Sequence, residues 1–222
     1  MKYAITLEHG RDGSYLAWVH DLPGCFARGA TRDAAVANAS DAVARFRDWL
    51  RQAGEPADDG DVEIVVADVV ESQIEAGEDT EALLDPDRES LSADEWQTTE
   101  RWLTHSREAL LRALAALPDE RLDERDEGRE RTVREQLIHV AFVELMYAAW
   151  TFDLRSRDGL ADFLAWTRGV ASDRMRALAE RQDASLTYAE WAGAPRPEPW
   201  TARKAARRLL WHELLHLPDI GA

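Results

Sequence analysis

Short runs of alternating apolar and polar positions occupy the first 70 residues and predict β-strands. The runs span residues 3–7, 15–19, 25–28 and 62–70. Alternation predicts strands because successive side chains of a strand point to opposite faces. Between the third and fourth runs, apolar residues recur every three or four positions, which predicts a helix that Thr31 caps. The pattern therefore predicts an α+β module of four strands with one helix packed on them.

After residue 91 the apolar residues take up the spacing of helices. Two capping boxes, Ser92 with Glu95 and Thr132 with Glu135, predict helix starts, because such pairs bond the free N–H groups of a first turn. Further helices are predicted over residues 133–154, 157–180 and 200–218. The first of these three is apolar nearly all round, which predicts a buried helix, and a proline-rich loop over residues 192–199 precedes the last. We therefore predict an all-α, up-down four-helix bundle.

Acidic residues accumulate between the two patterned regions. Residues 54–90 contain 14 acidic residues and a single basic one, Arg88. Within them, residues 75–89 show no strand pattern and no strong helix pattern, which is typical of a solvated linker. The predicted organisation is an α+β domain at residues 1–74, an acidic linker at 75–90 and the helical bundle at 91–222.

The net charge of the chain is −16, and it is concentrated in the first 90 residues, which hold 8 basic and 20 acidic residues. Such a surface repels phosphate backbones, so nucleic-acid binding is not expected. No apolar run approaches the roughly 18 residues of a membrane span. The start of the chain lacks a signal-peptide pattern, and the single cysteine, Cys25, fits a reducing compartment. We expect a cytoplasmic protein in which Cys25 has a structural role.

The last predicted helix carries two histidines, His212 and His216, on its small and apolar face. They are four residues apart, which places their β-carbons roughly 6 Å apart on one side of a helix. Pro218 ends the helix soon after, because proline cannot continue the hydrogen-bond ladder. Two stacked imidazoles that face a core are either metal ligands in need of a third ligand or a hydrogen-bonded pair of core histidines.

One further histidine, His139, lies in the apolar helix predicted over residues 133–154. A lone histidine in such a helix is more often a core residue with its hydrogen bonds satisfied. Together with a histidine pair on another helix, however, it supplies the three nitrogen ligands with which a bundle can build a metal site at its core. Three protein ligands leave positions for water or substrate, which is typical of a catalytic metal site.

The helical region resembles the DinB family of four-helix-bundle metalloproteins over residues 91–222. The residues that carry the resemblance are the helix start at 91–95, the cap at Thr132 and Glu135, His139 with Glu144 and Tyr147 after it, and the segment 200–203 that leads to His212 and His216. The resemblance implies a divalent metal, zinc or nickel, held by His139, His212 and His216. It also implies a metal-dependent enzyme, either a hydrolase or an S-transferase that uses a low-molecular-weight thiol such as bacillithiol or mycothiol, with a small-molecule thiol or electrophile as substrate.

Three further residues are candidates for the site. Glu144 and Glu213 could orient the metal ligands or act as a base, or they could form salt bridges with the arginines of the last helix. Tyr147 could donate a hydrogen bond to substrate or only pack against its neighbours. We expect His105 to lie on the surface, and we assign no role to the histidines of the first module.

The first module resembles the HicB-like antitoxin domain. The resemblance rests on residues 3–7, 13–17 and 21–25 and on Gly29 to Thr31 at the start of the predicted helix. It implies a protein partner, a small ribonuclease toxin, with the bundle as a scaffold. The alternative is a module recruited only for packing. Small helical bundles often pair, which makes a homodimer a further expectation.

Overall fold

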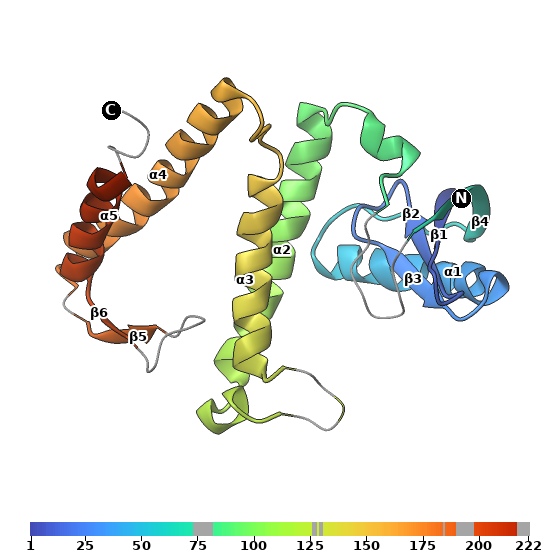
Figure 1. Ribbon diagram of the computed structural model, residues 1–222. Coiled ribbons are helices and arrows are strands. Elements are labelled where there is room, and N and C mark those ends of the chain that lie inside the picture. The colour runs from blue at the N-terminus through green and yellow to red at the C-terminus, as the bar shows by residue number, and fades with distance from the viewer. Residues whose placement is uncertain (73–81, 126–127, 129–130, 184, 190–197, 217–222) are drawn as a thin grey trace. The chain divides into compact units, whose positions relative to one another are not determined.

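The computed structural model (Figure 1) describes residues 1–72, 82–125, 128, 131–183, 185–189 and 198–216, and of residues 211–216 it describes the backbone alone. The chain forms two compact units, residues 1–118 and 119–222, and each is described by itself. The domain boundaries suggested by the sequence, at residues 74 and 91, stay a prediction. None of the helices in the described ranges combines the length and the apolar content needed to cross a bilayer.

A four-stranded sheet forms the centre of the first unit. Its strands are β1 (Lys2–His9), β2 (Tyr15–Val19), β3 (Phe26–Gly29) and β4 (Glu63–Glu71). They lie in the order β3-β2-β1-β4, with antiparallel β1–β2 and β2–β3 pairs and a parallel β1–β4 pair. The parallel pair requires a crossover, and helix α1 (Arg32–Gln52) supplies it.

Helix α1 lies along one face of this sheet (Figure 1). Its cap is Thr31, as predicted, whose side chain accepts a hydrogen bond from the Ala34 N–H at 3.2 Å. Residues of β1 and one stripe of residues on α1 cover each other. Ile5 and Leu7 of β1 and Val43 of α1 are each 0 % exposed. Burial of these apolar side chains is the main favourable contribution to the stability of the module.

Helix α2 (Ala93–Ala116) belongs to the first unit together with the short 3₁₀ helix η1 (Asp85–Arg88). The predicted capping box starts α2: the Ser92 N–H donates to Glu95 Oε2 at 2.8 Å, and the Glu95 N–H donates to Ser92 Oγ at 3.3 Å. Trp102 of this helix packs against the core of the module. Residues 73–81, which include the first part (75–81) of the predicted linker, lie outside the described residues.

The second unit contains the helices α3 (Val133–Ala149), α4 (Arg157–Glu180) and α5 (Ala202–His216), preceded by the 3₁₀ helix η2 (Asp119–Leu122). Helices α4 and α5 lie side by side, and a hairpin of β5 (Thr187–Ala189) and β6 (Glu198–Trp200) precedes α5 (Figure 1). Phe152, in the turn before α4, packs its ring against those of Phe163 and Trp166 at 5.6 Å each. This aromatic cluster fixes the turn onto the first half of α4.

The structure confirms the predicted fold class, in which N-terminal strands and a helix are followed by a helical region. It also corrects two details. Helix α3 ends at Ala149 rather than near residue 154, because the chain turns at Trp150, and the expectation that this helix is buried is wrong for its described side chains, since Phe142 is 70 % exposed. The predicted loop at 192–199 lies outside the described residues up to 197, and its last two positions belong to strand β6.

Candidate functional site

The candidate metal ligand His139 lies in the first half of helix α3 and is half-buried. The capping box of Thr132 and Glu135 starts this helix seven residues before His139, with the Thr132 N–H donating to Glu135 Oε2 at 2.8 Å. Within the described part of the chain, no side chain hydrogen-bonds the His139 ring.

The two other candidates on α3 are on the surface of the described structure. Glu144 is exposed and already takes part in a polar interaction. Tyr147 is 51 % exposed, and its ring lies 5.6 Å from that of Trp150 in a tilted arrangement. The structure therefore gives the half-exposed Tyr147 one aromatic packing partner, Trp150.

Helix α5 carries the positions of the remaining candidates, His212, Glu213 and His216. Its backbone is helical through all three, so positions 212 and 216 are one turn apart on the same side of the helix, as predicted. The side chains of these three residues lie outside the described residues. The convergence of His139, His212 and His216 on one ion therefore stays a prediction. Among the side chains that the structure does describe, no group of three or more histidine, cysteine or acidic residues could hold a metal ion.

The start of helix α5 is held by a set of contacts that the sequence did not predict. The Thr201 hydroxyl accepts a hydrogen bond from the Lys204 N–H at 3.2 Å. The Lys204 ammonium pairs with Glu198 at 2.7 Å and stands 4.6 Å from the centre of the Trp200 ring. These contacts join strand β6 to the first turn of α5. Thr201 at a cap position could have been recognised from the sequence. The position of the Lys204 ammonium over Trp200 depends on the pairing of β5 with β6, and the sequences of these two strands show no strong alternation.

The residues present fit a metal site in the chemistry of their donor atoms. Neutral imidazole is the commonest protein ligand for zinc and nickel. His139 has a ring with no competing hydrogen bond among the described residues, and α5 presents two histidine positions at the spacing with which helices bind metals. This donor set suits a transition metal better than calcium or magnesium, which prefer oxygen ligands.

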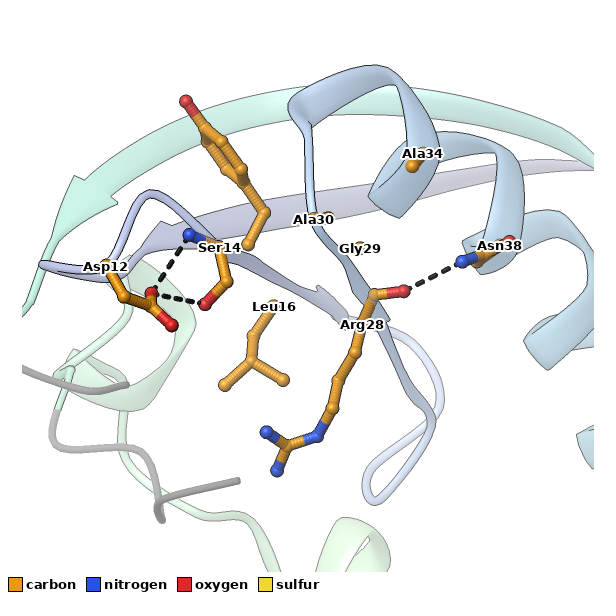
Figure 2. A pocket seen from close by; sticks show the side chains of 9 residues that line it. Asp12, Ser14, Leu16, Arg28, Gly29, Ala30, Ala34 and Asn38 are labelled. Carbon is orange, nitrogen blue, oxygen red and sulfur yellow. Dashed lines mark hydrogen bonds between the residues drawn. The ribbon is translucent and has the colours of Figure 1, made fainter. Parts of the chain in front are cut away.

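The N-terminal module contains a separate hollow of about 470 Å³ beside the start of helix α1 (Figure 2). The Asn38 amide donates to the Arg28 carbonyl at 2.8 Å, which closes one end, and Asp12 Oδ1 accepts from the Ser14 N–H at 3.0 Å at the other. Leu16 forms part of the lining between them. The hollow adjoins the edge strand β3, so a partner that approaches this edge would meet both polar and apolar groups.

Cys25 has the structural role expected of it. The side chain is 3 % exposed within the core of the first module, and burial raises the pKa of its thiol to about 11 against the weaker opposing effect of Arg45. A thiol that stays protonated at neutral pH is a poor nucleophile. Burial and a raised pKa therefore fit a structural role for Cys25.

Fold and candidate residues together define a protein of two parts, an α+β module and a helical region with histidines on two separate helices. The model of the DinB superfamily matches residues 102–220, more than half of the chain, and the chain belongs to this superfamily. The superfamily is generally metal-binding.

The N-terminal part is a HicB-like domain. The model described as the HicB-like antitoxin of bacterial toxin–antitoxin systems matches residues 3–94. UPF0150 protein Ta0767 of Thermoplasma acidophilum is 35 % identical over 55 residues, which cover 25 % of this chain and 80 % of that protein. No solved structure matches the chain.

Proposed function

We propose that the protein is a metal-dependent enzyme of the DinB type, with His139, His212 and His216 as ligands of one divalent ion, zinc or nickel. The observation that carries the proposal is the match to a generally metal-binding superfamily over residues 102–220, a range that contains all three histidines. The proposal is also supported by the ring of His139, to which no described side chain forms a hydrogen bond. A divalent ion held by neutral imidazoles supplies Lewis-acid chemistry, which lowers the pKa of a coordinated thiol or water.

The reaction class that we propose is S-transfer from a low-molecular-weight thiol to a small electrophile, or else hydrolysis. In this scheme Glu144 or Glu213 accepts the proton that the nucleophile loses, and Tyr147, half-exposed beside Trp150, donates a hydrogen bond that orients the substrate. A reducing compartment such as the cytoplasm, where thiols stay reduced, suits both this chemistry and the unpaired Cys25.

Metal analysis of the purified full chain tests the site directly. The protein is prepared without a histidine tag, and zinc and nickel are measured in the wild type, His139→Ala, His212→Ala and the matched control His9→Ala, whose ring pairs with Glu71 in the other module. We expect about one ion per chain in the wild type and control, as in a single site with three protein ligands, and loss of the ion in the two site variants. Metal-free wild-type protein after zinc and nickel reconstitution would refute the proposal.

The thiol is tested by replacing the native ion with Co(II). Candidate thiols are added one at a time to the Co(II) protein. A thiol that coordinates the ion changes its visible absorption, because sulfur replaces water as a ligand. An unchanged spectrum with every thiol, in a protein that holds the ion, would favour the hydrolase over the S-transferase.

A second function is favoured by the HicB-like domain itself. We propose as the alternative that this module captures a protein partner, a small basic ribonuclease of the toxin type, with the helical region as a scaffold. The match over residues 3–94 and the excess of 12 acidic over basic residues in positions 1–90 (20 against 8) support a basic partner. The hollow beside β3 offers a place for it (Figure 2).

Co-purification of a small basic ribonuclease with the full chain would support the alternative, and binding would weaken with added salt. Charge reversal at the hollow, Asp12→Lys, should reduce capture more than Asp94→Lys on helix α2. Sedimentation of the same preparations measures whether the protein is a homodimer, a further proposal that rests on the tendency of small bundles to pair.

A further inference from the structure

We propose that the HicB-like module clamps helix α2, so that the helix in which the two family matches meet folds as part of the module. The HicB-like match ends at residue 94 and the DinB match begins at residue 102, and both positions lie within α2. In the first unit this helix contacts the module through one aromatic and one ionic anchor. The module would then hold in place the helix in which the DinB-like region begins.

The aromatic anchor is Trp102. Its ring meets that of Phe46 edge-on at 5.5 Å, and Phe46 in turn meets Trp49 edge-on at 5.2 Å. Both partners belong to α1 and pack against the buried core of the module. Edge-to-face aromatic contacts stabilise beyond the area that they bury. By contrast Trp96, two turns earlier on α2, is 44 % exposed.

The ionic anchor is Glu55, whose side chain is only 10 % exposed. Glu55 follows the end of helix α1, where Gly54 takes a left-handed conformation and the Glu55 N–H donates to the Leu50 carbonyl at 2.9 Å. The end of α1 thus fixes the position of the carboxylate.

On the other side of this contact, Arg101 spans both oxygens of Glu55, at 3.2 and 3.3 Å, and His105 Nε2 lies 3.3 Å from Oε1. The hydrogen bond from Arg101 is the largest effect and holds the pKa of Glu55 below its ordinary value, burial opposes it, and the hydrogen bond from His105 adds a smaller lowering. The expectation that His105 is a plain surface residue is therefore wrong. Arg101 and His105 are neighbours on one face of α2, and both contact the carboxylate of Glu55.

Hydrogen exchange of the full chain tests the clamp. In Trp102→Ala, exchange across α2 and across residues 46–55 should rise at least about tenfold, because local opening depends on the contacts that hold a segment. The matched control Trp96→Ala, on the same helix, should change exchange by less than about twofold. Equal exchange of α2 in the wild type and Trp102→Ala would overturn the proposal.

A second variant decides the matter if Trp102→Ala unfolds the chain. Glu55→Gln keeps the size of the side chain and removes its charge, and we expect it to speed exchange of α2 about threefold, as for the loss of a partly buried ion pair. Arg112→Gln, which breaks only the pair with Glu108 within α2, should leave residues 46–55 unchanged. If Glu55→Gln behaves like Arg112→Gln, the clamp does not exist.

Discussion

The two parts of the molecule differ in how far their apolar side chains are covered. In the sheet and helix α1, side chains such as Ile5, Leu7 and Val43 have no exposed surface. In α2, α3 and α4, no side chain is buried among the described residues, and Phe142 and Leu164 are 70 % and 67 % exposed. A sheet of strands joined by short turns needs only one helix over one face to bury its core. An apolar helix is buried only by neighbouring elements, which its own sequence does not specify.

This contrast separates stability from candidate chemistry. The closed core, with its inert buried thiol, provides stability and presents no proposed catalytic residue. The candidates His139, Glu144 and Tyr147 stand on helix α3, which has no buried side chain in the described structure. Functional groups are commonly placed on parts of a fold that can open or rearrange.

The largest predicted effect comes from removing a side chain from the closed core. Ile5→Ala should lower the free energy of unfolding by about 4 kcal/mol, because the site is fully buried and leaves a cavity. Ile138→Ala, the same change at a helix position that is 50 % exposed, should cost less than about 1 kcal/mol. Urea denaturation of the full chain measures both. An equal loss for the two variants would show that α3 is covered as fully as β1 and would break the comparison.

A pair of glycines gives a second contrast, in which the single loss is smaller and the two effects have opposite signs. A β-carbon on Gly29 would stand 2.2 Å from the Ala35 amide nitrogen in the first turn of α1, so Gly29→Ala should destabilise by about 3 kcal/mol through overpacking. A β-carbon on Gly169 of α4 would meet nothing within 4 Å, so Gly169→Ala should stabilise by about 0.5–1 kcal/mol, as alanine does in a helix interior. Thermal denaturation of the two variants should move in opposite directions.

The buried thiol of Cys25 adds a pH dependence of stability in the alkaline range. The pKa of Cys25 is about 11 in the folded chain against an ordinary 9.0, so the folded state holds this proton more tightly than the unfolded state does. The resulting stability is complete below pH 9 and is lost as pH rises towards 11, by about 2–3 kcal/mol. The measurement is urea denaturation between pH 8 and 10.5 of the wild type and Cys25→Ala. The free-energy difference between them should shrink or reverse as pH rises, and a constant difference would contradict the shift.

Much of the fold could be predicted because its signals are local. The residues of β2 and the start and end of α4 were placed correctly from alternation and helical spacing, and all of Thr31, Ser92 and Thr132 cap the helices assigned to them. Three features escaped because they depend on distant partners. These are the β5–β6 hairpin, the end of α3 at Ala149 and the burial of helices. An apolar pattern predicts that a helix face packs against another element, but it does not identify that element.

The candidate site was predictable in part. The sequence placed His139 and positions 212 and 216 on helices, and the structure agrees for each backbone. Whether the three rings meet depends on the packing of α3 against α5, which spacing within a helix cannot specify. The contacts of Arg101 and His105 with Glu55 were missed for the same reason, since 46 and 50 residues separate the partners.

The smallest predicted effect sharpens the comparison at the helix starts. Thr132→Ala removes the acceptor of the Glu135 N–H, at 3.2 Å in α3, and Ser92→Ala removes the corresponding acceptor in α2. Each loss should cost about 1 kcal/mol, but the consequences should differ. Helix α3 has 17 residues and no buried side chain, so its first turn depends on the cap, whereas α2 is also anchored at Trp102.

Hydrogen exchange should therefore rise along the first half of α3 in Thr132→Ala, and only in the first turn of α2 in Ser92→Ala. Hydrogen bonds from the cap residues hold the pKa of Glu95 and Glu135 below their ordinary values. Both caps should accordingly weaken as pH falls through those lowered values, when the carboxylates take up protons and stop accepting from the cap N–H groups. If exchange rises over an equal length of both helices, the contact at Trp102 adds no support to α2 beyond its cap. The closed part of the molecule would then consist of the sheet and α1 alone.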